Sequence, residues 1–261
     1  MPDEDFIIAL FSEVDDNMRE IKKHPQLNLH PSEIVTLAIL FAIKGVGNRA
    51  FYRWIMKNWH FLFPRLSERT RLFRLFKKHA DWANCFLANP TVLGVIDTYG
   101  IEFIHPIREG RSPWQIGRKG ISNHRWIVGG KLCMLLNQFG LVVGWACDTA
   151  NVHDSHFLYL VEQYQDQMIV LSDLQFHNKG GDPVNLKLCD RGSWNERMLV
   201  ETVLSMLTTI SHFKKIAHRV WEYFHAHLAF AMAAFNILVQ WYGLKPNENG
   251  FIPLSIAEFN L

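Results

Sequence analysis

The first third of the chain has apolar residues at spacings of three and four, which is typical of helices that pack through one face. Pro31 and Glu33 are helix start signals, and Gly45-Val46-Gly47 is a helix breaker. Ser67 is expected to cap the last helix of this region. The pattern therefore predicts helices over residues 4–23, from His30–Glu33 to about 45, 48–58 and 67–79.

After Asn89-Pro90 the apolar period changes from helical to strand-like. Short β-branched runs predict strands over residues 92–97, 101–107, 126–136, 141–147, 168–172 and 184–189. The basic stretch 108–125 is expected to be a loop. A helix capped by Asp154 or Ser155 and reaching residue 164 is expected before the fifth strand, and further helices over 195–207 and 218–242.

This order predicts an α/β fold with two parts. Residues 1–89 are expected to form an N-terminal helical, helix-turn-helix-like region that binds DNA. Residues 90–261 are expected to form a mixed sheet flanked by helices, with C-terminal helices attached. The expected succession of antiparallel strands, a helix, a strand and a further helix is that of the ribonuclease-H-like fold, which is the fold class we predict.

Two of the predicted strands end in a carboxylate, at Asp97 and Asp173, and a third acid, Glu201, lies in a helical segment. A right-handed crossover after a meander can place the two strands side by side. Converging carboxylates repel one another unless cations are bound, and Mg²⁺ or Mn²⁺ takes oxygen ligands. Two such ions support phosphoryl transfer. We therefore predict a two-ion site, while noting that Asp at a strand end is commonly a turn or cap residue.

The charges are unevenly distributed, although the formal net charge is only +2. Residues 1–33 hold eight acids against three bases, whereas residues 44–79 hold ten bases against one acid. A basic block is the electrostatic footprint expected for a polyanion such as nucleic acid. Arg69, Arg71 and Arg74 lie in the last predicted helix, which would enter a major groove if this region is a helix-turn-helix. The alternative is a solvated helix face.

Composition narrows the classes of protein further. The chain of 261 residues is 49% hydrophobic and 20% charged, as expected for a globular protein. Its four cysteines form no C-x-x-C pair, which argues against a zinc knuckle and fits a reducing cytosol. No signal peptide is recognised and the longest apolar runs are too short to span a bilayer, so we expect a cytoplasmic protein with no membrane partner.

Several segments resemble one family. They are Gly94–Thr98, Gly129–Leu132 with Asn137–Gly140, Ala150–Asp154, Val170–Asp173 and Arg197–Leu207. Together they resemble the insertion-sequence transposases with a DDE catalytic motif, in the branch with a tyrosine-arginine-glutamate-lysine signature. The resemblance covers most of residues 91–240. It implies DNA cleavage and strand transfer at the ends of a mobile element, with Asp97, Asp173 and Glu201 as ligands of two Mg²⁺ or Mn²⁺ ions.

The resemblance also implies the partners. These are double-stranded DNA, both terminal inverted repeats and target DNA, and a second copy of the chain on that DNA, in a nucleoid-associated complex of a prokaryote. The residues expected to contact DNA are Arg69, Arg71, Arg74, Lys119, Lys131, Arg197, Lys214 and Lys215.

The sequence departs from the family pattern at three places. Leu174-Gln175-Phe176 follows the second aspartate, where the family has a small or basic residue, then Gly and Tyr. Trp194 stands for the signature tyrosine and Thr208 for the lysine, whereas Arg197 and Glu201 keep their spacing. Two alternatives to an active transposase therefore stay open. One is a catalytically inactive remnant or DNA-binding protein, and the other is a different ribonuclease-H-like nuclease.

Overall fold

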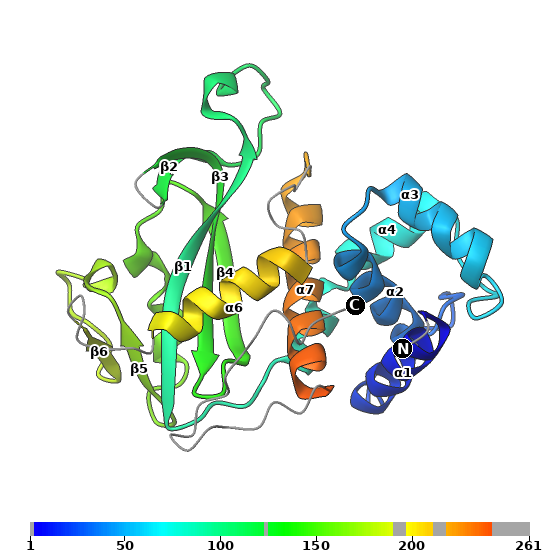
Figure 1. Cartoon of the computed structure of the whole chain (residues 1–261), viewed down its shortest axis with the longest axis horizontal. Coiled ribbons are helices and arrows are strands. Elements are labelled where there is room, and N and C mark those ends of the chain that lie inside the picture. Colours follow the sequence, from blue (N-terminus) through cyan, green and yellow to red (C-terminus); the bar gives the residue numbers. More distant parts are fainter. Residues whose placement is uncertain (1–2, 123–124, 190–196, 211–217, 242–261) are drawn as a thin grey trace. The chain divides into compact units, whose positions relative to one another are not determined.

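The structure, a computed structural model, describes residues 3–122, 125–189, 197–210 and 218–241 (Figure 1). The chain forms two compact units. The first comprises the helices up to Phe86 together with Glu222–Ala234 of the long helix α7 (Trp221–Trp241). The second comprises the described residues from Leu87 to Trp221 and residues 235–241 at the end of α7. The protein is thus α/β, with a mixed sheet and several helices.

The first unit is built around α2 (Pro31–Lys44), most of whose residues are buried. The backbone N–H of His30 donates to the Glu33 carboxylate, and Gly45 ends the helix in the left-handed region at φ 58°. Phe41 packs edge-to-face on Phe51 and Phe73. Around α2 lie α1 (Asp3–Asn17), α3 (Asn48–Trp54), a π-helical turn (Ile55–Trp59), α4 (Arg69–Lys78) and a 3₁₀ turn (Ala80–Phe86).

The four predicted N-terminal helices are present, with one error at a cap. Glu68, and not Ser67, is the N-cap of α4, because its carboxylate accepts the backbone N–H of Arg71 at 2.8 Å. Ser67 is buried at 4% exposure. Within the described residues no single helix is long and apolar enough to cross a membrane. Pro31–Lys44 and Asn48–Trp59 pass such a test only as a pair, bent by 117°.

The second unit is organised by a curled six-stranded sheet of order β2-β3-β1-β5-β6, with β4 also paired to β3. β1 (Leu93–Ile104), β3 (Arg125–Asn137) and β4 (Val142–Thr149) are antiparallel neighbours. β5 (Ile169–Ser172) runs parallel to β1, and β6 (Leu186–Leu188) runs parallel to β5. The parallel pairing of β1 with β5 matches the neighbour relation expected from the sequence.

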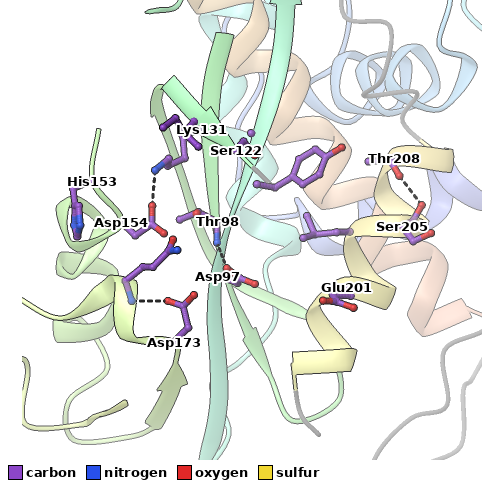
Figure 2. A pocket seen from close by; sticks show the side chains of 15 residues that line it. Asp97, Thr98, Ser122, Lys131, His153, Asp154, Asp173, Glu201, Ser205 and Thr208 are labelled. Atoms are coloured by element: carbon purple, nitrogen blue, oxygen red, sulfur yellow. Dashed lines mark hydrogen bonds and ion pairs between the residues drawn. The ribbon is translucent and has the colours of Figure 1, made fainter. Parts of the chain in front are cut away.

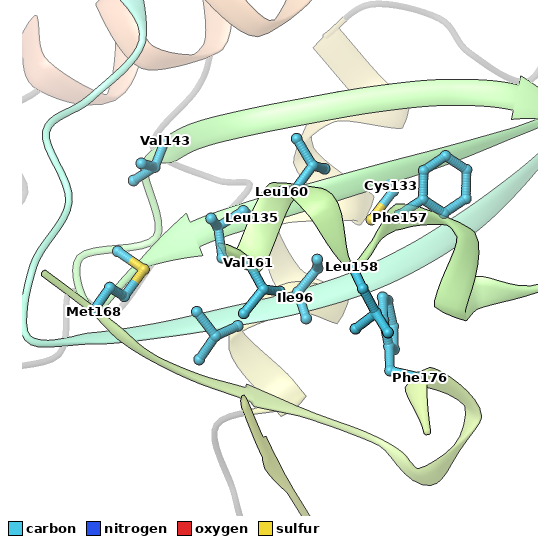
Figure 3. Close-up of a cluster of buried hydrophobic side chains, with 11 residues drawn as sticks. Ile96, Cys133, Leu135, Val143, Phe157, Leu158, Leu160, Val161, Met168 and Phe176 are labelled. Atoms are coloured by element: carbon cyan, nitrogen blue, oxygen red, sulfur yellow. The ribbon is translucent and has the colours of Figure 1, made fainter. Parts of the chain in front are cut away.

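Both faces of the central strands are buried, as is usual where helices cover a sheet on both sides. On one face Ile96, Cys133 and Leu135 pack under the segment between β4 and β5, where Phe157 and Val161 lie (Figure 3). This segment contains a 3₁₀ turn (Asp154–Phe157) and α5 (Tyr159–Glu162). The helix α6 (Arg197–Ile210) contacts β1 and crosses the sheet in Figure 1.

Three expectations about strands and caps were wrong. Leu93–Ile104 form the single strand β1, where two strands over 92–97 and 101–107 were expected, because β3 is long enough to pair with the polar stretch Asp97–Gly100 as well as with its apolar flanks. The basic stretch 108–125 contains β2 (Arg118–Ser122), an edge strand on β3, where charged residues are common. His153, and not Asp154 or Ser155, is the N-cap before α5, and the expected helix is broken into two short turns.

A buried amide ties the end of α7 to the sheet inside the second unit. Asn236 has no exposed surface, and its side chain accepts the N–H of Val142 at 2.9 Å and donates to the carbonyl of Val142 at 2.8 Å. Both bonds join residues far apart in the sequence, so this contact holds the start of β4 in place.

We predict that Asn236→Ala lowers the free energy of unfolding by about 1–3 kcal/mol, because the buried N–H of Val142 loses its acceptor. Urea denaturation followed by circular dichroism measures this difference. Gln240→Ala, a truncation at an exposed position of the same helix, is the matched control. Equal midpoints for the two variants would contradict the role assigned to Asn236.

Candidate active site

The candidate site lies where β1 extends beyond the end of its parallel neighbour β5. β5 pairs with β1 only from Leu93 to Val95, whereas β1 continues to Ile104 along β3. Beyond the end of β5, four consecutive residues of β1 line a cavity of about 700 Å³, from Asp97 to Gly100. Consecutive residues of a strand point to opposite faces, so a run of four at one cavity indicates that the cavity touches the open edge of the strand.

Asp97 lies at this open edge. Its carboxylate accepts the backbone N–H of Thr98 at 2.7 Å. The β1–β5 register pairs Val95 with Leu171, and two residues further along each strand stand Asp97 and Asp173. The strand register therefore brings the two aspartates to the same level of the sheet, and both line the cavity.

Asp173 follows the last residue of β5 and caps the next turn. Its carboxylate accepts the N–H of Gln175 at 2.9 Å, at the start of the 3₁₀ turn Leu174–Phe176. Phe176 is fully buried in the core beneath, which anchors the turn that carries the carboxylate. Asp173 can therefore cap the turn and also belong to the candidate site, because one carboxylate oxygen accepts the N–H of Gln175 while the side chain lines the cavity.

Glu201 reaches the cavity from α6. Helical spacing separates the two sides of this helix. Val200, Val203, Met206 and Leu207 are buried. Glu201, Leu204, Ser205 and Thr208 line the cavity, at intervals of three and four residues. Figure 2 shows Asp97 on β1 between Asp173 and Glu201. The structure therefore gathers all three sequence-predicted acids around one cavity.

The wall of the cavity on the β3 side contains an ion pair. The ammonium of Lys131, on β3, lies 2.5 Å from the carboxylate of Asp154 (Figure 2). It also donates to the carbonyl of Val152 at 2.7 Å. The side chains of Lys131 and Asp154 are only 12% and 5% exposed. Pairing of this kind is required for buried charges. Lys131, expected to contact DNA, is therefore engaged with its own chain.

The thiol of Cys133, close to this ion pair, is shielded from solvent. Cys133 lies on β3 two residues after Lys131 and is completely buried. Burial raises the pKa of the Cys133 thiol well above its ordinary value, and the nearby carboxylates of Asp154 and Asp97 raise it further. Cys133 is therefore a neutral core side chain and supplies no thiolate to the cavity.

The remaining predicted DNA contacts fall in three places. On α4, Leu72, Phe73 and Phe76 are buried, while Arg71 and Arg74 are exposed and Arg69 is half-buried. Lys119 is exposed on β2, 3.7 Å from Glu109 and 5.2 Å above the ring of Trp126. Arg197 begins α6, but its side chain lies outside the described residues, as do Lys214 and Lys215.

Sequence reasoning missed the partnership of Lys131 with Asp154, which are separated by 23 positions. It also missed Ser122, Gln175 and Ser205 as lining residues. The only available signal was that Lys131 and Asp154 both stand in segments singled out by the family resemblance. Thr208, at the position of the family's lysine, does face the cavity, where it donates to the carbonyl of Ser205 at 2.8 Å.

The chemistry that this arrangement supports is set by oxygen ligands. Among the residues that the structure describes, no three His, Cys, Asp or Glu side chains already converge closely enough to hold a metal ion. Three carboxylates around one cavity nevertheless form a hard-ligand set. No protein-family model matches the chain, and no curated protein matches it in a sequence search.

We predict that Lys131→Met lowers the free energy of unfolding by about 3–5 kcal/mol, because it leaves the Asp154 carboxylate buried without a partner. The double variant Lys131→Met/Asp154→Leu is expected to recover most of this loss, since it removes both charges. A double-mutant cycle by chemical denaturation measures the coupling.

Lys119→Met is the matched control, because Lys119 pairs with Glu109 at the surface, where ion pairs contribute roughly 0–1 kcal/mol. A double variant no more stable than Lys131→Met would show that the charge pair is not what stabilises this wall.

Proposed function

We propose that this protein is a DNA transposase that cleaves DNA and transfers strands with two divalent metal ions. The observation that carries the proposal is the gathering of Asp97, Asp173 and Glu201 around one cavity, from a strand, the end of its parallel neighbour and a helix. The sheet order supports a ribonuclease-H-like fold, because three antiparallel strands (β4, β3, β1) are followed by two parallel ones (β5, β6).

The residues around the cavity fit hard divalent cations. Carboxylate oxygens are the ligands that Mg²⁺ and Mn²⁺ prefer, and the described residues include no cluster of soft ligands at the cavity. Asp97, Asp173 and Glu201 would hold the ions. Carboxylates that converge without cations repel one another, so bound cations would stabilise the three acids at this cavity. When bound, the ions would supply activation of a water or 3′-hydroxyl and stabilisation of the leaving oxygen at phosphorus.

The other residues of the cavity have supporting tasks in this proposal. The turn anchored by Phe176 would keep Asp173 level with Asp97, and the buried face of α6 would keep Glu201 turned to the cavity. Ser205 and Thr208 offer hydroxyl groups on the same helix face, suited to neutral contacts with a phosphate oxygen. The exposed arginines of α4 would bind the phosphates of duplex DNA.

A second candidate is a DNA-binding protein that does not cut. The observation that favours it is the engagement of two predicted ligands with backbone N–H groups, Asp97 with Thr98 and Asp173 with Gln175. In this case the two carboxylates would act only as acceptors for the backbone N–H groups of the turn and of the strand edge. The departure at Leu174-Gln175-Phe176 from the residues that follow the second aspartate in the DDE transposases would then reflect the loss of cleavage.

We predict nicking and joining of DNA that carries the inverted repeats flanking the coding region, in Mg²⁺ or Mn²⁺, and loss of both products on chelation with EDTA. Asp97→Asn is expected to abolish cleavage while duplex binding is retained, because the amide cannot replace the anionic ligand. Gel analysis of end-labelled DNA measures cleavage and joining, and fluorescence anisotropy measures binding.

The matched control is Asp166→Asn, the same chemical change at an exposed turn position before β5. Cleavage that persists in EDTA would exclude the metal mechanism. Binding without cleavage by the wild type, under either metal, would favour the second candidate. Hydrolysed strands with no joined product would indicate a nuclease on the same fold.

A further inference from the structure

The loop between β1 and β2 (residues 105–117), called here the β1–β2 loop, exposes two large apolar side chains, Ile107 and Trp114. Trp114 is 84% exposed and Ile107 is 72% exposed. Figure 1 shows this loop projecting beyond the strands that carry it. A tryptophan side chain gains more from burial than almost any other residue, so its display on a projecting loop calls for a partner.

The loop holds a defined conformation through bonds of its own. The side chain of Gln115 accepts the N–H of Gly110 at 2.8 Å, and Ser112 accepts the N–H of Trp114 at 3.2 Å. Gly110 and Gly117 have φ values of 73° and 79°, which a residue with a Cβ adopts only with strain. The indole is therefore presented by a folded turn.

The surroundings of Trp114 are basic. Arg108, Arg111, Arg118 and Lys119 are all exposed on the loop and the first residues of β2. The one acid of this stretch, Glu109, lies 3.7 Å from Lys119. A projecting indole among exposed cations matches an unpaired nucleic acid strand, whose bases stack on aromatic rings while its phosphates bind arginine and lysine.

The position of the loop relative to the candidate site points to the same partner. The strands that carry the loop also line the cavity, through Tyr99 and Gly100 of β1 and Ile121 and Ser122 of β2. A strand of DNA whose phosphate enters the cavity would have its neighbouring nucleotides near these strands. We propose that the β1–β2 loop binds unpaired DNA next to the cleavage position, with Trp114 stacking on a base and Arg108 and Arg111 binding phosphates.

This inference rests on the proposed function, since it takes DNA as the substrate of the cavity. It adds a preference for unpaired over paired DNA, which DNA cleavage by itself does not require. DNA with unpaired bases should bind more tightly than fully paired DNA of the same length, and the difference should depend on one side chain.

The test compares two DNA probes of one mixed sequence, a 30-base-pair duplex and the same duplex with a central bubble of unpaired bases. Anisotropy is measured without divalent metal, so that no cleavage occurs. Trp114→Leu keeps an apolar side chain and removes the ring, and it is expected to weaken bubble binding about 5- to 100-fold while leaving duplex binding within about twofold. Trp114→Phe is expected to keep most of the affinity.

Two further variants sharpen the result. Tyr159→Leu removes an exposed aromatic ring from α5 and is the matched control, with no expected effect on either probe. Arg108→Ala/Arg111→Ala is expected to reduce the slope of log affinity against log salt for the bubble probe by about 1.4, because two contacts to single-stranded phosphates are lost.

The outcomes separate the two proposals. If the wild type binds neither probe, the proposed function fails and this inference fails with it. If the wild type binds DNA but Trp114→Leu binds the bubble equally well, only this inference is overturned. Equal weakening on both probes would also overturn base stacking. A last outcome would identify a lipid surface as the partner of the loop. In that outcome the wild type binds phosphatidylserine–phosphatidylcholine vesicles, Trp114→Leu does not, and the two proteins bind both DNA probes equally well, which would also overturn the proposal.

Discussion

The candidate site depends on a mismatch in strand length between β1 and β5. β5 pairs with β1 only as far as Val95, so among the described residues no parallel strand continues along that edge of β1 at the level of Asp97. Here the backbone N–H of Thr98 donates a hydrogen bond to the Asp97 carboxylate. The same mismatch opens the cavity and places Asp173 beside it. A longer β5 would close the edge and remove the space that a substrate needs.

Packing on the two faces of the sheet then decides which side chains reach this space. On one face the core around Ile96 and Phe157 holds the segment that carries His153 and Asp154. On the other, α6 is held by its buried residues, so that its polar stripe with Glu201 and Thr208 faces the cavity. The Lys131–Asp154 pair places an ammonium group in the wall of a cavity that is otherwise rich in carboxylates. Because the charges of Lys131 and Asp154 cancel, this pair leaves the carboxylates of Asp97, Asp173 and Glu201 as the net charge around the cavity.

The two regions proposed to bind DNA differ in kind. The arginines of α4 lie on a helix whose opposite face is buried, which is suited to the regular backbone of a duplex. The β1–β2 loop combines cations with a single exposed indole and belongs to the strands that line the cavity. The division suggests that recognition of the duplex and handling of an opened strand are carried by separate structures of one chain.

The sequence by itself determined the types and order of most elements, because apolar period and helix start signals act over a few neighbouring residues. It also singled out Asp97, Asp173 and Glu201, since strand ends and helix faces can be read locally. Only the tertiary structure decided that Thr98–Gly100 continue a strand, that residues 118–122 pair with β3, and that Lys131 meets Asp154. Each of these depends on a partner distant in the chain. A polar stretch becomes a strand only when a long neighbour supplies hydrogen bonds, and a buried charge is tolerated only beside its counter-charge.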